Sequence, residues 1–172
     1  MVNLLRSLLP HWGFGLLISL VVGLFLFPPT VLAAETQLQW QGEQGYQVEA
    51  QLIYPDHGTT EMVAIEGKGQ PRRLDTLTVR IYDPQGQELA TYQNVSAGQP
   101  GKSDFLQLHF DPQQQQLRGW LDIGGAIGNE YFLKGQAGIS LDLFYLDAQG
   151  QETKVDHNAG QVEVVPNHPD RY

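Results

Sequence analysis

The chain contains no cysteine among its 172 residues. A bacterial lipoprotein anchor is therefore excluded, because the lipid is attached to a cysteine, and a catalytic cysteine nucleophile is excluded as well. The absence also removes the disulfide found in antibody-type domains. A domain of this length buries about two-thirds of its unfolded surface, so it needs no disulfide even in an oxidising compartment.

Motifs of the common hydrolases are missing. The chain has neither G-x-S-x-G nor H-E-x-x-H. Serines after residue 33 are Ser96, Ser103 and Ser140, and none has a base nearby in the sequence. Carboxylates available for a glycosidase pair are Glu49, Asp122, Glu130 and Asp142. The sequence favours a non-catalytic protein and leaves a hydrolase with a site assembled across loops as an alternative.

Basic residues are scarce, and the few charges are unevenly distributed. Residues 1–33 hold Arg6 as their one charged residue and an apolar run over 14–27, which the adjacent prolines Pro28 and Pro29 end before the small residues that precede Glu35. This layout predicts a signal peptide over residues 1–33, cut after Ala33 or Ala34. The alternative is an uncleaved membrane anchor, because the uncharged run from Trp12 is long enough to cross a bilayer.

The predicted mature chain is strongly acidic. Nine of the ten basic residues and all 19 acidic residues lie after residue 33, which gives a formal charge of −10. Such a surface repels phosphate backbones and anionic lipid, so nucleic acid is not expected as a partner. Residues 34–166 are predicted to form one domain, followed by a polar tail over 167–172.

No part of the mature chain shows the spacing of apolar residues that an amphipathic helix requires. Short alternating segments separated by turn residues predict strands instead. The clearest is a hairpin over 77–92, in which Leu77, Val79 and Ile81 alternate with polar residues before the turn Asp83-Pro84-Gln85-Gly86. Further strands are predicted at 38–40, 46–54, 105–110, 117–123, 139–145 and 162–165, and the short apolar runs 62–65 and 131–133 are candidates for additional short strands. We therefore expect an all-β, Ig-like two-sheet antiparallel sandwich of seven to nine strands.

One short pattern occurs twice. D-P-Q-G-Q-E at 83–88 returns as D-A-Q-G-Q-E at 147–152, each time after an alternating strand. Two hairpins that share good turn chemistry explain this more simply than a duplicated half-domain. The strings L-Q-W-Q-G near Trp40, Y-D-P-Q-G-Q-E and L-D-L-F-Y-L-D-A-Q-G resemble small exported β-sandwich proteins of cyanobacteria. That resemblance implies a cellular location, the periplasm or the thylakoid lumen, and implies no activity.

Metal ligands are present but not grouped. The histidines of the mature chain are His57, His109, His157 and His168, and no two have ligand spacing on one element. Asp83, Asp111 and Asp147 lie in predicted turns and are weak candidates for calcium, although starting a turn is reason enough for an aspartate. The loop Gly124–Gly128 lacks the helix that follows a phosphate-binding loop, and no cofactor is predicted.

The candidate ligand-binding residues lie on one polar strand face and beside the hairpin turn. Trp120 is flanked by Arg118 and Asp122 on the side opposite the apolar residues, and Tyr82 and Tyr92 flank the turn. Exposed aromatic rings can stack on sugars, whereas a buried Trp120 would pack against another layer. We expect a binding or structural accessory module of the envelope that contacts a protein or glycan in the periplasm, thylakoid lumen or extracellular space. A calcium- or carbohydrate-binding module is the alternative.

Overall fold

The computed structural model describes residues 32–56, 62–67, 70–96, 99–100, 105–125 and 127–165. The predicted signal segment up to residue 31, the predicted tail, His57 and His168 lie outside this part of the chain. The described residues form strands and turns, and none of them belongs to a helix that is long and apolar enough to cross a membrane. The all-β class expected from the sequence is confirmed.

The smaller of the two main sheets has five antiparallel strands. Their order is β15 (Glu163–Val165), β1 (Ala33–Gln41), β2 (Gln47–Pro55), β5 (Thr76–Tyr82) and β6 (Glu88–Gln93). Leu38 and Trp40 on β1, and Val79 and Ile81 on β5, face inwards because alternate side chains of a strand point to opposite faces. The other face of this sheet carries the intervening polar residues.

The larger sheet has eight strands. Its order is β14 (Glu152–Asn158), β13 (Ser140–Leu146), β12 (Glu130–Gln136), β11 (Trp120–Ile123), β9 (Leu106–Asp111), β3 (Val63–Glu66) and β4 (Gln70–Arg72), with β10 (Gln116–Leu117) paired to β9. A separate two-stranded ribbon consists of β7 (Val95–Ser96) and β8 (Gln99–Pro100).

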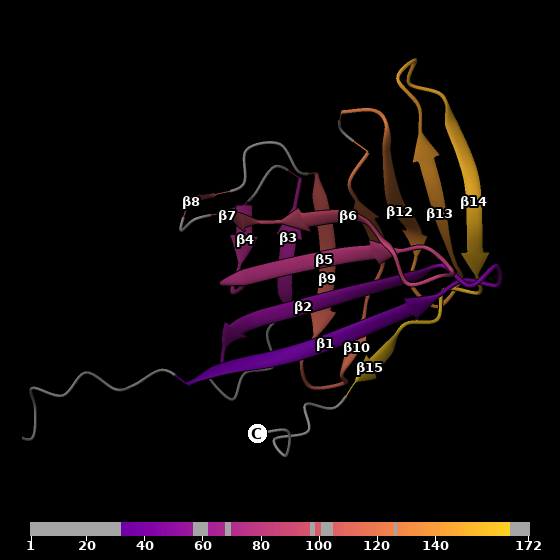
Figure 1. Cartoon of the computed structure of the whole chain (residues 1–172). Coiled ribbons are helices and arrows are strands. Elements are labelled where there is room, and N and C mark those ends of the chain that lie inside the picture. Colours follow the sequence, from indigo (N-terminus) through magenta and orange to yellow (C-terminus); the bar gives the residue numbers. More distant parts are fainter. Residues whose placement is uncertain are drawn as a thin grey trace, which may run out of the picture. The chain divides into compact units, whose positions relative to one another are not determined.

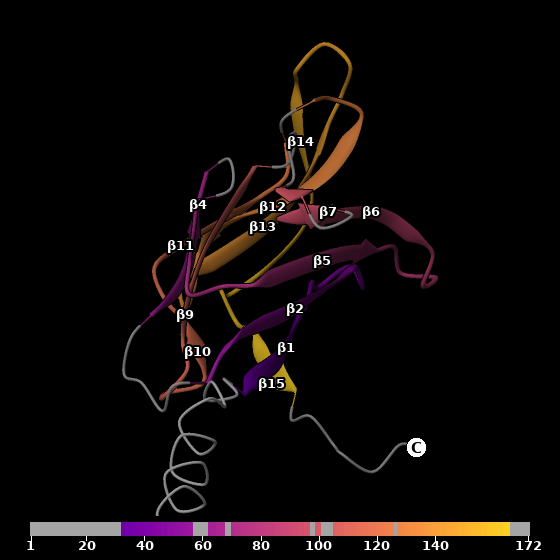
Figure 2. The same ribbon diagram turned by 90° about the vertical axis from the view of Figure 1, so that its left-hand side faces the viewer.

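The two sheets form the two layers of a β-sandwich, which is visible from the side in Figure 2. Strands β1, β2, β5 and β6 run across the direction of β9, β12, β13 and β14 (Figure 1), as in sandwiches whose sheets cross steeply. One hydrophobic core lies between them, and Leu52, Ile81, Phe110 and Leu143 are completely buried in it. The fold therefore leaves two polar outer faces, one on each sheet, on which a ligand can lie.

The predicted hairpin is confirmed. Strands β5 and β6 flank a turn in which Gly86 has φ +82°, and the Asp83 carboxylate accepts hydrogen bonds from the N–H groups of Gln85 and Gln87. The second copy of the pattern folds in the same way. Gly150 has φ +81°, and Asp147 accepts from Gln149 and Gln151 at 2.9 and 2.8 Å.

The predicted count of seven to nine strands is wrong for the described residues, which contain fifteen. Part of the difference is subdivision: Gly119, at φ +68°, separates β10 from β11 within the predicted strand 117–123. The rest are strands in segments for which the sequence predicts no strand. The clearest is β14, whose residues are mostly polar because it forms an edge of its sheet and its side chains are largely exposed.

The turn between β1 and β2 is attached to β14 of the opposite sheet. The Asp156 carboxylate, 2 % exposed, accepts hydrogen bonds from the N–H groups of Gln44 and Tyr46 at 2.9 and 3.1 Å. A Cβ atom at Gly42 would lie 2.1 Å from Asp156 Oδ2, so this position has no room for a larger residue. This contact joins the two sheets at one corner.

Candidate functional site

The predicted recognition face is the outer side of the larger sheet. Trp120 lies there at the start of β11 with 49 % of its surface exposed, so its ring is not buried in a second layer. Asp122 is half-buried on the same side, opposite Lys134 of β12. Burial raises the pKa of Asp122, and the Lys134 charge opposes that change. Trp120 and Asp122 are thus neighbours on one accessible face.

Arg118 is held by the preceding turn. Its guanidinium donates a hydrogen bond to the Gln114 side chain and lies 3.5 Å from Asp111 Oδ2. It is exposed, and its charge is partly balanced by these turn residues. Arg118 therefore stabilises the β9–β10 turn in addition to lying near Trp120 in the sequence.

Tyr82 and Tyr92 do not join this face. Tyr82 lies on β5 of the other sheet, where burial and then the nearby Glu49 charge raise its pKa. Tyr92 is 5 % exposed, and its hydroxyl donates to Glu130 Oε2 at 2.9 Å and lies 2.5 Å from the Tyr131 carbonyl. The five predicted residues are therefore spread over two sheets and the core.

The three turn aspartates bind their own backbone. Asp83 and Asp147 cap the two equivalent hairpins, and Asp111 accepts from the N–H groups of Gln113 and Gln114 at 3.0 and 3.1 Å. Within the described residues, no group of three or more histidine, aspartate or glutamate side chains is placed to hold a metal ion. Each aspartate thus has a local structural role.

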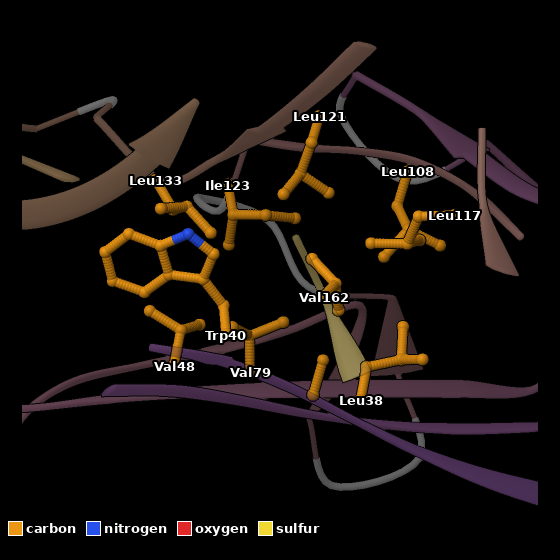
Figure 3. A pocket seen from close by; sticks show the side chains of 11 residues that line it. Leu38, Trp40, Val48, Val79, Leu108, Leu117, Leu121, Ile123, Leu133 and Val162 are labelled. Atoms are coloured by element: carbon orange, nitrogen blue, oxygen red, sulfur yellow. The ribbon is translucent and has the colours of Figure 1, made fainter. Parts of the chain in front are cut away.

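A small apolar cavity lies between the sheets (Figure 3). Its volume is about 20 Å³, and its walls include Leu38, Trp40, Leu121 and Leu133. The Trp40 Nε1–H group is buried and has no hydrogen-bond partner in the described structure. Space for one water is available, but the apolar walls offer that water no second partner, so the cavity does not constitute a ligand site.

Three tyrosines form a row beside the core. The ring centroids of Tyr46 and Tyr131 are 6.4 Å apart, and those of Tyr131 and Tyr145 are 5.1 Å apart. The pKa of Tyr131 is raised mainly by burial, and to a smaller extent by the neighbouring Tyr46, Tyr145 and Asp83. These rings pack against one another, as tilted aromatic pairs do in protein cores.

The most extensive hollow among those described is polar and lies on the outer face of the smaller sheet. One depression, of about 410 Å³, is lined by Gln37, Gln39, Glu49, Gln51 and Arg80 together with Leu38, Ala50 and Val165. A second, of about 440 Å³, is lined by Gln39, Gln41, Gly42, Glu43, Asn158, Ala159, Gln161 and Glu163. Gln39 lines both, so the two adjoin along β1. We call them together the polar groove.

Strand pairing explains why these side chains lie together. Gln37, Gln39 and Gln41 alternate with buried residues on β1, so they point to the same outer face. Glu49 of β2 pairs with Gln39 on one side and with Arg80 of β5 on the other. Glu163 of β15 pairs with Gln39 from the opposite direction. From Gln37 to Gln41 the groove follows the strand for roughly 14 Å, at about 3.4 Å per residue.

Not every polar group in the groove is available to a ligand. Asn158 is occupied, because its amide donates to the Gln41 and Gln161 carbonyls and accepts from Gly160. Gln51 donates to Glu35 at 2.7 Å. By contrast, within the described part of the chain no hydrogen bond or ion pair engages the side chains of Gln39 or Arg80, which are both half-buried.

The sequence alone did not identify this groove. Alternation indicated that Gln47, Glu49 and Gln51 face solvent, but such a polar face is ordinary for a half-buried sheet. The missing information was tertiary: β15 returns beside β1, which places Glu163 against Gln39. The cluster of glutamines at alternate positions 37, 39 and 41 was the one signal available.

Comparisons with family models, with curated proteins and with solved structures find no significant match to this chain.

Proposed function

We propose that the mature chain is an exported, non-catalytic binding module whose ligand lies in the polar groove. The observation that carries this proposal is the pair of adjoining depressions along β1, lined by amide, guanidinium and carboxylate groups on one sheet face. Rigid strands hold these groups at fixed spacings, which lowers the entropy lost when a ligand binds.

A binding role is supported by how the potentially reactive side chains are used. The Ser140 hydroxyl bonds to Asp142 at 3.2 Å, and Glu130 accepts from Tyr92. Glu49 lies on the outer face of the smaller sheet, whereas Asp142 lies on the larger sheet and pairs with Lys154 at 3.2 Å. Because these carboxylates belong to different sheets or to structural pairs, they favour a binding module over the hydrolase alternative.

The export of the protein and its Ig-like character are part of the same proposal. In Ig domains, strands A-B-E-D face strands C-F-G. Here the sheet β1-β2-β5-β6 faces a sheet in which β3, β9 and β11 lie side by side in that order. This arrangement supports an Ig-like central unit, which β12–β14 extend in one sheet and β15 extends in the other. Two differences from an Ig domain are that β5, the earlier strand, takes the place next to β2, and that the two sheets cross steeply instead of packing at about −30°. Export to the periplasm, thylakoid lumen or extracellular space follows from the signal-peptide pattern, and cleavage would leave β1 at the mature N-terminus.

The proposal is tested by sedimentation of purified mature protein with washed envelope material from its native host. We expect retention of the wild-type protein and loss of retention when Gln39 and Arg80 are both changed to alanine. The matched control is Gln107→Ala, since Gln107 is another half-buried glutamine on a strand but lies on the outer face of the larger sheet. Equal sedimentation of all three proteins, or of none, would contradict the proposal.

Trp120 supports a second candidate surface, because a large aromatic ring on the larger sheet is 49 % exposed. At an exposed position, Trp120→Ala should change the free energy of unfolding by less than about 1 kcal/mol, against about 3–5 kcal/mol for a large buried aromatic residue. Chemical denaturation measures this difference. Loss of envelope retention in Trp120→Ala, with Gln39→Ala unaffected, would assign binding to this face instead.

A further inference from the structure

We propose that the ligand of the polar groove is a neutral, hydroxyl-rich glycan chain, and that Arg80 and Gln39 determine this specificity. This inference rests on the proposed binding function and specifies its ligand class. Its basis is the mixture of hydrogen-bonding groups in the groove, considered together with the charge of the whole chain.

The donors and acceptors of the groove are balanced. The amides of Gln37, Gln39, Gln41 and Gln161 each supply an N–H₂ donor and a carbonyl acceptor. Arg80 adds donors only, and Glu49 beside it adds acceptors only. A sugar hydroxyl both donates and accepts, so a chain of hydroxyl groups can pair with every one of these side chains.

Charge argues against a polyanion. Such a polymer would meet the carboxylates of Glu43, Glu49 and Glu163 in the groove and the charge of −10 expected for the mature chain. A polycation would meet one guanidinium, that of Arg80, among these three carboxylates, so charge does not separate it from a neutral chain. The neutral class is inferred from the groove's amides, because each amide both donates and accepts, as a hydroxyl group does.

The geometry is that of an extended ligand. The groove follows β1 past Gln37, Gln39 and Gln41, with Arg80 to one side in the first depression and Gln161 and Glu163 in the second. Gln39 lines both depressions and is half-buried, so a chain that fills the groove must pass over it. Loss of its amide should therefore weaken binding more than loss of an amide at either end.

The experiment is affinity electrophoresis of the full mature protein in gels that contain dextran or hydroxyethylcellulose (neutral), alginate (anionic) or soluble chitosan (cationic). We expect retardation by a neutral polymer that stays constant between low and high salt, because screening does not affect uncharged ligands. Gln39→Ala should raise the apparent Kd about three- to tenfold, as for loss of one or two ordinary hydrogen bonds. Gln107→Ala should leave it unchanged. Arg80→Gln, which keeps a donor, should retain more affinity than Arg80→Ala.

Three results would overturn the inference. The first is retardation only by alginate or chitosan, with an affinity that falls as the salt concentration rises. If Gln39→Ala abolishes this retardation, the groove remains the binding site and only the neutral ligand class is refuted. The second is neutral-glycan binding that Gln39→Ala and Arg80→Ala do not weaken. The third is no retardation by any of these polymers while envelope sedimentation depends on the groove, which would assign the groove to a partner other than a glycan.

Discussion

Asp156 joins the two sheets at the β1–β2 corner, together with Asn158, whose amide donates to the Gln41 carbonyl. The buried Asp156 carboxylate accepts from Gln44 and Tyr46, so replacement by alanine leaves these two partly buried N–H groups without an acceptor. We expect Asp156→Ala to lower the free energy of unfolding by about 2–3 kcal/mol. Asp83→Ala removes two comparable hydrogen bonds at an exposed turn and should cost less than about 1.5 kcal/mol. Urea denaturation measures the free energy of unfolding of both variants. Equal losses in the two would contradict a special role for Asp156.

Asp122 predicts a pH dependence of stability. Its pKa is raised, first by burial, with Lys134 opposing, so the ionised carboxylate is less favourable in the folded than in the unfolded chain. Its contribution to stability therefore falls as pH rises from the ordinary carboxyl pKa through the raised value, and stays low above it. Asp122→Asn should be more stable than the wild type at pH 7, and the difference should shrink below pH ~4. A variant less stable than the wild type at neutral pH would mean that attraction to Lys134 outweighs burial.

The β5–β6 and β13–β14 hairpins are a matched pair of elements. Gly86 and Gly150 have φ +82° and +81°, and an added Cβ would meet no atom within 4 Å at either position. A substitution there is costly through backbone conformation alone. We expect Gly86→Val and Gly150→Val each to lower the free energy of unfolding by about 1–3 kcal/mol, and Gly→Asn to cost less at both. Melting curves that show no loss in either valine variant would contradict the assigned turns.

These two hairpins also show how far the sequence predicts the elements. Alternation and turn residues were sufficient for β5, β6 and β13, because local chemistry determines them. Strand β14 was missed because its polar residues suit an exposed edge, and alternation is then lost. Of the candidate site, Trp120 was correctly placed on the polar side of its strand. Tyr92 was not recognised as a core residue, since its partner Glu130 lies 38 residues away in the sequence.

At the scale of the whole molecule, the two sheets expose two different outer faces. The face of the larger sheet uses many of its charges in pairs, such as Lys134 with Glu152 at 2.5 Å and Lys154 with Asp142 at 3.2 Å. On the face of the smaller sheet, Gln51 donates to Glu35 and Glu49 is hydrogen-bonded to Tyr82, whereas no hydrogen bond or ion pair of the described residues engages the side chains of Gln39 or Arg80. Since paired charges are already satisfied, the smaller sheet offers more free hydrogen-bonding groups to a ligand. This contrast is the reason for placing the binding site there.

The most direct test of that placement is a chemical-shift map. Isotope-labelled mature protein would be titrated with soluble polysaccharide fragments released from the native envelope, and backbone amide shifts would be followed by NMR. The account predicts shifts concentrated on β1, β2, β5 and β15, with the largest near Gln39 and Arg80 and none around Trp120. Shifts confined to β11 and its neighbours around Trp120, or an unchanged spectrum at saturating fragment, would contradict it.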